Sequence, residues 1–366
     1  EYTFNSGTIS ELKAGYIYTI KIGLSESVLG SVDQIEGGNS PYKPGGDVNG
    51  NAEAVTPEIP GYMVVEAPAD DAEALAGCLN GKQGPIALKF VTGNTYKADM
   101  ITVPADITDL LLIGKEGQAK VTMKGLSVPE RTLNKLTFQD LEIEGTDANT
   151  AICAAELKED AELTVKGCYI HGVKAVYGRG KDLAQKHSTD FSRLSSFTID
   201  DSRIYNVECV FDYGVVLAVT LNNSTLYNLS QIAFFSSKSN DTNDIKQCEP
   251  IKVTNCTLVD LKKNLVQTAG GYGYLTNYEN NISILAGDAH IAYGVKGANN
   301  SAYTFVIQNN IAATGSGIKI ADFTNNGAID NTKSRAEIFP NEDAGDSGKN
   351  FTPADGITIG DPRWKK

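Results

Sequence analysis

The amino-acid sequence predicts an all-β protein that folds as a right-handed single-stranded parallel β-helix. The first observation is a short phrase that recurs between Leu136 and Ala312, with fixed internal spacing and variable distances between copies. This pattern is typical of a solenoid whose coils differ only in their loops. The second is composition, since Val, Ile, Thr, Tyr and Phe dominate these stretches and no apolar run keeps helical spacing. An immunoglobulin-like sandwich is the main alternative, but side chains that repeat in register favour the β-helix.

The repeated phrase predicts two short strands that meet at a tight bend. Its apolar or small residues alternate with polar ones at the period of a strand, and the phase slips by one residue in the middle. The clearest copies begin at Leu136, Leu163, Phe197, Val219 and Ile251, with looser ones at Tyr278 and Phe305. The slip residues are of types that tolerate a left-handed backbone. They are Asp140, Gly167, Asp201, Asn223 and Asn255. A third apolar run follows at Val176, Val210 and Ile232, so we expect three strands per coil.

The rest of the chain predicts how the solenoid is closed at its ends. Residues 70–79 give the one clear helix signal, with Asp70 or Asp71 as its cap and Asn80-Gly81 as its end. This helix is expected to cover the first coil, which would otherwise expose unpaired edges. The single tryptophan, Trp364, is expected to plug the last coil. The predicted organisation is a β segment at 1–24, a Gly- and Pro-rich linker at 25–60, and the β-helix domain at 61–366.

Charge and cysteine content limit the possible partners. The net charge is −13 and the sequence pI is about 4.8, which disfavours nucleic acid and anionic membrane surfaces. No apolar stretch is long enough to span a bilayer. The six cysteines have no metal-ligand spacing, and Cys168 and Cys256 are predicted to point into the core as free thiols. A monomer is expected, and the start at Glu1 suggests a processed or trimmed chain.

Several motifs resemble those of a known family. The segments that carry the resemblance lie at 72–75, 86–88, 93–96, 101–103 and 112–114, followed by the Asn-Cys-Thr-Leu and Asn-Asn-Ile phrases and the closing Gly-Asp-Pro-Arg-Trp. Together they resemble pectin-lyase-like right-handed β-helix proteins, and in particular secreted or lipid-anchored proteins of Bacteroidetes. The resemblance implies an extracellular or outer-membrane surface location, a lipid anchor before processing, and a place in glycan utilisation. Leu12–Ile22 also resembles the last strand of a fimbrillin-like domain.

The catalytic equipment of that family is not evident in the sequence. Polygalacturonases of this fold carry Gly-His-Gly and Arg-Ile-Lys motifs, and pectate lyases carry an Arg base beside carboxylates that hold Ca²⁺. Neither tripeptide occurs, and the chain has only three histidines. The acidic pair Asp200-Asp201 falls at the bend of the phrase and is interpreted as a turn element. The sequence therefore favours a binding protein over an enzyme.

Two outward-facing columns are candidate binding surfaces. In the first, side chains after the bend stack on neighbouring coils about 4.8 Å apart, where aromatic rings could stack on sugars. Its residues are Tyr169, His171, Arg203, Tyr205 and Tyr227, which follow Glu142 and Glu144 of the preceding coil. The alternative is that Tyr and Thr are simply favoured on exposed sheet surfaces.

The second column follows the third strand and borders the two longest insertions, 180–195 and 236–249. Long loops beside an aromatic sheet face favour a ligand-binding cleft. Its candidate ligand-binding residues are Tyr177, Arg179, Phe211, Tyr213, Phe235 and Lys238. The alternative is that the phenylalanines pack under the loops as a satellite core. Asp212 could face either way.

The expected function is carbohydrate binding without catalysis, by a surface or secreted protein of a glycan-utilisation system. The negative charge favours a neutral or basic glycan over a polyanionic one. The first alternative is a polysaccharide lyase or glycoside hydrolase, with Arg179 or His187 as base and Asp241 or Asp244 as acid or Ca²⁺ ligand. The second alternative is a structural adhesin module. No metal site and no cofactor are expected, with Ca²⁺ as the possible exception.

Overall fold

The structure is a computed structural model of the chain. It describes residues 18–22, 32–37, 59–115, 117–154, 157–178, 193–212, 215–236, 248–268, 273–293, 306–320, 325–343 and 350–365. The chain divides into two units, residues 1–58 and residues 59–366. Each unit is described by itself.

The first unit contains one antiparallel strand pair among its described residues. Strands β1 (Tyr18–Ile22) and β2 (Val32–Gly37) pair with Tyr18 opposite Gly37 and Ile20 opposite Ile35. Strand β1 lies in the expected β segment. Strand β2 lies in the stretch expected to be a linker. It was not predicted because its short alternation of apolar and polar residues is surrounded by Gly and Pro residues.

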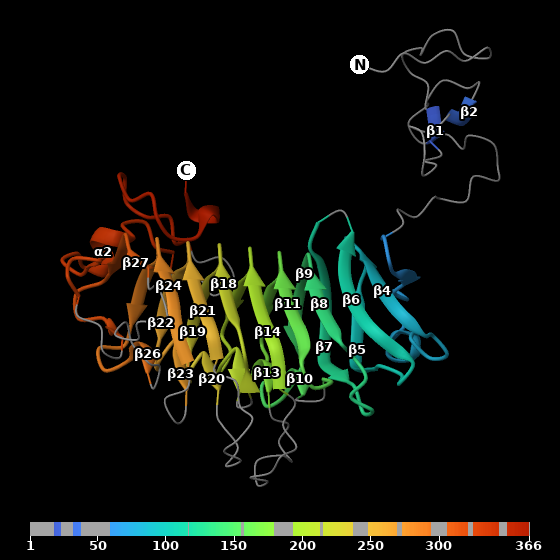
Figure 1. Cartoon of the computed structure of the whole chain (residues 1–366), viewed down its shortest axis with the longest axis horizontal. Coiled ribbons are helices and arrows are strands. Elements are labelled where there is room, and N and C mark those ends of the chain that lie inside the picture. The colour runs from blue at the N-terminus through green and yellow to red at the C-terminus, as the bar shows by residue number, and fades with distance from the viewer. Residues whose placement is uncertain are drawn as a thin grey trace. The chain divides into compact units, whose positions relative to one another are not determined.

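The second unit is a parallel β-helix of about 8 turns, as predicted (Figure 1). Its strands form three stacks in which each strand pairs with its equivalent in the next coil. The first stack consists of β3 (Met63–Glu66), β4 (Gly84–Val91), β6 (Ile107–Lys115), β8 (Lys135–Gln139), β11 (Ala161–Lys166), β14 (Arg193–Asp200), β17 (Val215–Val216), β18 (Val219–Asn222), β21 (Cys248–Thr254), β24 (Gly273–Glu279) and β27 (Val306–Gln308). The second consists of β5 (Tyr96–Thr102), β7 (Ala119–Ser127), β9 (Leu141–Gly145), β12 (Tyr169–His171), β15 (Arg203–Tyr205), β19 (Thr225–Leu229), β22 (Thr257–Leu261), β25 (Ile282–Leu285), β28 (Asn310–Ala312) and β30 (Ile329–Asp330). The third consists of β10 (Ala151–Ala154), β13 (Ala175–Gly178), β16 (Phe211–Asp212), β20 (Phe234–Ser236), β23 (Val266–Thr268), β26 (His290–Tyr293) and β29 (Lys319–Ile320).

The predicted bends between the first and second stacks are confirmed. The slip residue has a left-handed backbone in every copy, with φ of 52° at Asp140, 62° at Gly167, 46° at Asp201, 48° at Asn223 and 54° at Asn255. Asp, Asn and Gly reach this region at low cost, which explains why the phrase places them there. The phrase therefore encodes the corner of each coil.

Polar side chains inside the corner satisfy the backbone where the ladder bends. The residue after the slip points inward, and its side chain accepts a hydrogen bond from the backbone N–H of its equivalent in the preceding coil. Ser202 accepts from Cys168 at 3.1 Å and Asn281 accepts from Cys256 at 2.9 Å. The two cysteines are fully buried free thiols, as predicted, and burial raises the pKa of the Cys168 thiol to about 12. This arrangement leaves few unpaired donors at the bends, as burial requires.

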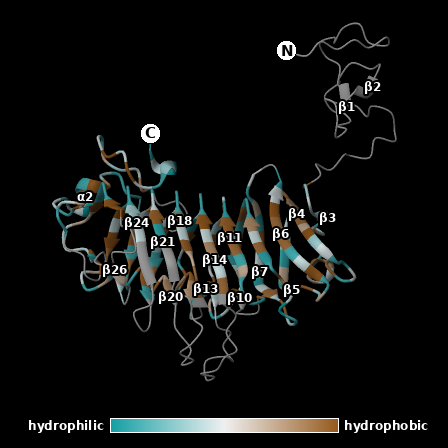
Figure 2. Cartoon of the chain, viewed as in Figure 1, coloured by the Kyte–Doolittle hydropathy of each residue, from teal (hydrophilic) through white to brown (hydrophobic). Residues whose placement is uncertain are grey.

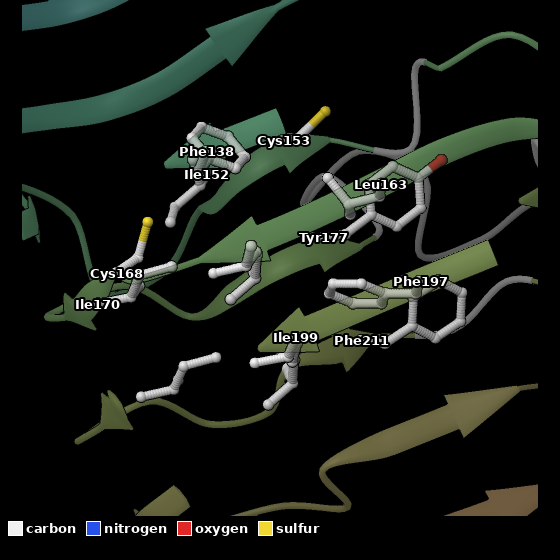
Figure 3. Close-up of a cluster of buried hydrophobic side chains, with 14 of the residues drawn as sticks. Phe138, Ile152, Cys153, Leu163, Cys168, Ile170, Tyr177, Phe197, Ile199 and Phe211 are labelled. Atoms are coloured by element: carbon white, nitrogen blue, oxygen red, sulfur yellow. The ribbon is translucent and has the colours of Figure 1, made fainter. Parts of the chain in front are cut away.

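The core is one continuous apolar column enclosed by the three stacks. Figure 2 shows the alternation of apolar and polar residues along the strands, and Figure 3 shows the packing in the central coils. Phe138, Leu163, Phe197 and Ile199 are fully buried there. Along the first and second stacks, alternate side chains thus enter the interior, as the period of a strand dictates.

The predicted helix forms and covers the start of the solenoid. Helix α1 (Ala72–Gly77) is capped by Asp71, whose carboxylate accepts a hydrogen bond from Ala74 N at 2.9 Å. The helix packs on β5, the first strand of the second stack, and buries Leu75 completely. Capping of the first coil is therefore confirmed.

The C-terminal segment, here called the strap (residues 335–343 and 350–365), lies along the outer face of the second stack. It contains α2 (Arg335–Ile338) and the short helix η2 (Pro362–Trp364). Its apolar side chains form a second core with outward residues of the stack. These strap residues are Ile338, Phe339, Phe351, Ile357, Ile359 and Trp364. The expectation that Trp364 plugs the last coil is wrong, because its indole Nε1 donates to Thr225 Oγ1 of β19 at 2.7 Å.

The strap is fixed by polar contacts as well as apolar ones. The buried carboxylate of Asp361 accepts hydrogen bonds from Thr225 at 2.6 Å and from the Arg363 guanidinium at 2.8 Å. Arg335 pairs with Asp260 of β22 at 2.9 Å. At Gly360 a Cβ would lie 2.9 Å from side-chain atoms of β22 and β25, so only glycine allows this close approach.

Candidate functional site

The third stack does not display the aromatic residues predicted for it. Tyr177 and Phe211 are fully buried in the core, with their rings stacked 5.5 Å apart (Figure 3). The expectation that they face outward is wrong because the third strand begins with a bend. Val176 N and Tyr177 N both donate to Val210 O at 3.1 Å, so the alternation is interrupted and two consecutive side chains point inward.

The outward column of the third stack starts one residue later than predicted. Pairing places Gly178, Asp212 and Phe235 in register, and Gln267 beside Tyr293 in the next coils. Phe235 is half-buried, in agreement with its predicted outward position. Asp212, which the sequence left ambiguous, faces outward and pairs with Lys174 at 2.9 Å.

The other predicted patch is in the predicted register but its rings are covered. Strand pairing aligns Tyr169 with Arg203, and His171 with Tyr205 and Tyr227. The three tyrosines are only 6%, 5% and 3% exposed. Their rings stack on each other, with centroids 4.9 Å apart for Tyr169 and Tyr205 and 4.7 Å apart for Tyr205 and Tyr227. Because the ring faces already have partners, this ladder serves packing rather than stacking on a sugar.

Both ends of the tyrosine ladder are closed by other side chains. The Arg203 guanidinium lies 4.1 Å from the centre of the Tyr169 ring, a cation–π contact. Phe351 of the strap lies 5.3 Å from the Tyr227 ring at the other end. Burial raises the pKa of the Tyr169 phenol to about 12, and burial also raises the pKa of Tyr205.

The remaining predicted residues lie outside the described part of the chain. They are the ligand candidates Arg179, Tyr213 and Lys238 and the catalytic candidates His187, Asp241 and Asp244. Arg179 was also the alternative base. The two predicted loops are only partly described, at residues 193–195, 236 and 248–249.

A different hollow, here called the Tyr293 pocket, combines an exposed aromatic ring with polar side chains. It has a volume of about 220 Å³ and is built by two consecutive coils. The turn between β22 and β23 contributes Lys262, Lys263 and Asn264, and the next coil contributes Asp288, Ala289, His290 and Tyr293. Tyr293 is 49% exposed, and its ring meets the His290 ring edge-on with centroids 5.0 Å apart.

A side-chain hydrogen bond of Asn264 joins the two coils that line the Tyr293 pocket. Its side-chain oxygen accepts a hydrogen bond from His290 N at 2.7 Å, and its side-chain nitrogen donates to Gln267 at 2.9 Å. The backbone of the two coils is joined by Leu265 N, which donates to His290 O at 2.9 Å. The amide of Asn264 therefore fixes the frame, while His290 and Tyr293 remain available to a ligand.

The electrostatics of the pocket keep its histidine neutral at pH 7. Burial lowers the pKa of His290 below its ordinary value of 6.5, and the nearby Lys319 ammonium lowers it further, while Asp288 opposes the shift. A neutral imidazole has one donor and one acceptor nitrogen. With Asp288 as an acceptor and Lys262 as a donor, the pocket can both accept hydrogen bonds from hydroxyl groups and donate hydrogen bonds to them.

A second hollow, of about 280 Å³, lies between β28 and the strap. Three isoleucines and no aromatic residue line it among the described residues, and its Lys333 is paired with Asp330. Its chemistry is thus less specific than that of the Tyr293 pocket.

Sequence reasoning missed the Tyr293 pocket because the repeat is weakest there. Ile232 was aligned with Val210, whereas pairing of Phe211 with Phe234 makes Ala233 the true equivalent. The correct register extends to Tyr293 through Gln267. The sequence signal was the His-Ile-Ala-Tyr strand at 290–293, which alternates with an aromatic residue at its end.

Comparison with family models, with curated proteins and with solved structures finds no match to this chain. Within the described residues, no helix is long and apolar enough to cross a membrane. The same part of the chain contains no group of three or more His, Cys, Asp or Glu side chains arranged to hold a metal ion. The fold and the pocket are therefore the basis for a functional conclusion.

Proposed function

We propose that this protein is a surface or secreted carbohydrate-binding β-helix protein that binds a neutral glycan without catalysis, in the Tyr293 pocket. The observation that carries the proposal is the exposed Tyr293 ring at the edge of a polar hollow. Sugar rings have apolar C–H faces and a rim of hydroxyl groups. A site that combines an aromatic ring with convergent donors and acceptors suits both parts.

The size and charge of the pocket support a single neutral sugar unit as the recognised element. A hollow of about 220 Å³ is below the range of about 300–1,000 Å³ that is usual for sites enclosing drug-sized ligands. One coil contributes Lys262 and Lys263 and the next contributes Asp288, so the lining contains both signs of charge. His290 is neutral at pH 7 and adds no net charge.

The wider setting of the proposal follows from the sequence. Resemblance to pectin-lyase-like proteins of Bacteroidetes favours a cell-surface or extracellular location, where polysaccharides are accessible. The fold alone does not imply this function, since one fold supports many activities. The pocket chemistry is what distinguishes the proposal from a purely structural role.

The test is a screen of soluble neutral oligosaccharides against the wild-type protein and three variants. Tyr293→Ala removes the ring and should weaken binding at least about tenfold, as expected for truncation of an aromatic residue central to a site. Tyr293→Phe keeps the ring and should retain most of the affinity. Met63→Ala, at an exposed apolar residue of β3, is the control. Equal binding by all four proteins, or no binding to any saccharide, would contradict the proposal.

A further inference from the structure

A row of threonines on the outer face of the first stack has no role in the Tyr293 pocket. The second position of the repeated phrase is Thr in four consecutive copies. Strand pairing places Thr137 beside Thr164, Thr164 beside Thr198, and Thr198 beside Thr220. Because neighbouring strands lie about 4.8 Å apart, the row extends about 14 Å along the solenoid axis. Figure 1 shows β8, β11, β14 and β18 side by side.

The hydroxyl groups of this row have no hydrogen-bond partner in the described part of the chain. Thr137 is the extreme case, since it is 8% exposed and its Oγ1 is buried and unpaired. Thr164, Thr198 and Thr220 are half-buried. A buried hydroxyl without a partner is unfavourable, and in this row the penalty applies to Thr137 alone. The half-buried hydroxyls of Thr164, Thr198 and Thr220 are the ones that an external partner with hydroxyl groups of its own can reach.

The charges that flank the row cancel. On one side Lys135 pairs with Glu162 at 3.9 Å, and their side chains are 43% and 55% exposed. On the other side Lys166 is in register with Asp200. The local balance of two positive and two negative charges differs from the strongly negative charge of the whole chain, and it suits an uncharged partner.

We propose that the threonine row is a second binding surface, which holds a linear neutral polysaccharide along the solenoid axis. A peptide would pair with backbone groups at a sheet edge, and this face offers none. A linear glycan offers hydroxyl groups at regular intervals along a straight line, as the row does. The inference rests on the proposed carbohydrate ligand but concerns a face separate from the Tyr293 pocket.

The test is adsorption of the full chain to insoluble neutral polysaccharides, namely microcrystalline cellulose, chitin and insoluble β-1,3-glucan. The variant Thr164→Val/Thr198→Val removes two hydroxyls and keeps the β-branched shape, so the fold should persist. We expect it to adsorb roughly tenfold more weakly, as for the loss of two neutral hydrogen bonds. Thr102→Val, at an exposed position of β5, is the matched control and should adsorb like the wild type.

The outcomes separate this inference from the proposed function. Adsorption that falls in the row variant and persists in Tyr293→Ala supports a second surface. Adsorption abolished by Tyr293→Ala and unchanged in the row variant overturns the inference while the pocket proposal stands. No adsorption of the wild type to any of the three solids also overturns it.

Discussion

Replacing Thr137 with valine should stabilise the free protein, because the threonine hydroxyl is buried without a partner. The side chain is 8% exposed and its Oγ1 has no hydrogen bond in the described structure. An unsatisfied buried polar group costs about 1–3 kcal/mol, and replacing it with an apolar group of the same shape removes that penalty. Allowing for residual access of water, we expect the free energy of unfolding to rise by about 1 kcal/mol.

Two companion variants isolate the hydroxyl from the methyl group. Thr137→Ser keeps the hydroxyl and loses the methyl, so it should be destabilised. Thr164→Val lies in the same row where the hydroxyl is half-exposed, and should change stability by less than about 0.5 kcal/mol. Urea unfolding followed by far-ultraviolet circular dichroism measures all three. A loss of stability in Thr137→Val would show that the hydroxyl has a partner, and would refute the reasoning for the whole row.

Three further predictions concern the strap, the tyrosine ladder and the pocket. Arg363→Ala should destabilise the strap by about 3 kcal/mol, because it leaves the fully buried Asp361 carboxylate without its charge partner. The fluorescence emission of the single tryptophan should then shift to the red at a lower urea concentration than in the wild type. An unchanged unfolding transition would contradict this prediction. The phenols of Tyr169 and Tyr205 have raised pKa values, so their contribution to stability is complete below pH 10 and is lost as the pH rises towards about 12. Phenolate absorbance should show that both phenols titrate at higher pH than free tyrosine. Titration of both at pH 10 in the folded protein would contradict the burial of the tyrosine ladder. Because the pKa of His290 is lowered, the affinity for a glycan should be constant through neutral pH. It should weaken only below pH 6.5, where protonation of His290 adds a positive charge beside Lys319. Calorimetric titration across pH checks this, and weaker binding already at pH 7 would contradict it.

The corner of each coil was predictable because its cause is local. A left-handed backbone at the bend selects Asp, Asn or Gly, and the sequence places Asp140, Gly167 and their equivalents at fixed positions in the phrase. The pairing of His171 with Tyr205 and Tyr227 followed from the same spacing. The strand register of the tyrosine ladder on the second stack was thus predictable from the sequence alone.

The parts that were wrong depend on contacts distant in sequence. Tyr177 and Phe211 point inward because two successive N–H groups share one carbonyl of the next coil, and a simple alternation does not encode such a bend. Trp364 lies against Thr225, 139 residues away, and no local pattern specifies that position. The burial of the tyrosine ladder is a consequence of ring stacking and of the same strap, so its exposure was overestimated.

The threonine row also changes how the repeat is understood. The second position of the phrase was predicted only to be a polar residue that alternates with the apolar core positions. Thr137, however, retains a hydroxyl that is unfavourable where it lies, although valine has equal β propensity.

The most direct test of the central claim is a calorimetric titration of neutral oligosaccharides into the wild type and into Tyr293→Ala at neutral pH. Carbohydrate binding in the Tyr293 pocket predicts saturable binding of at least one oligosaccharide by the wild type. It also predicts affinity at least about tenfold weaker in the variant, with an unchanged circular dichroism spectrum. Saturable binding of the same affinity in both proteins would place the site elsewhere, and no binding by the wild type would contradict the account.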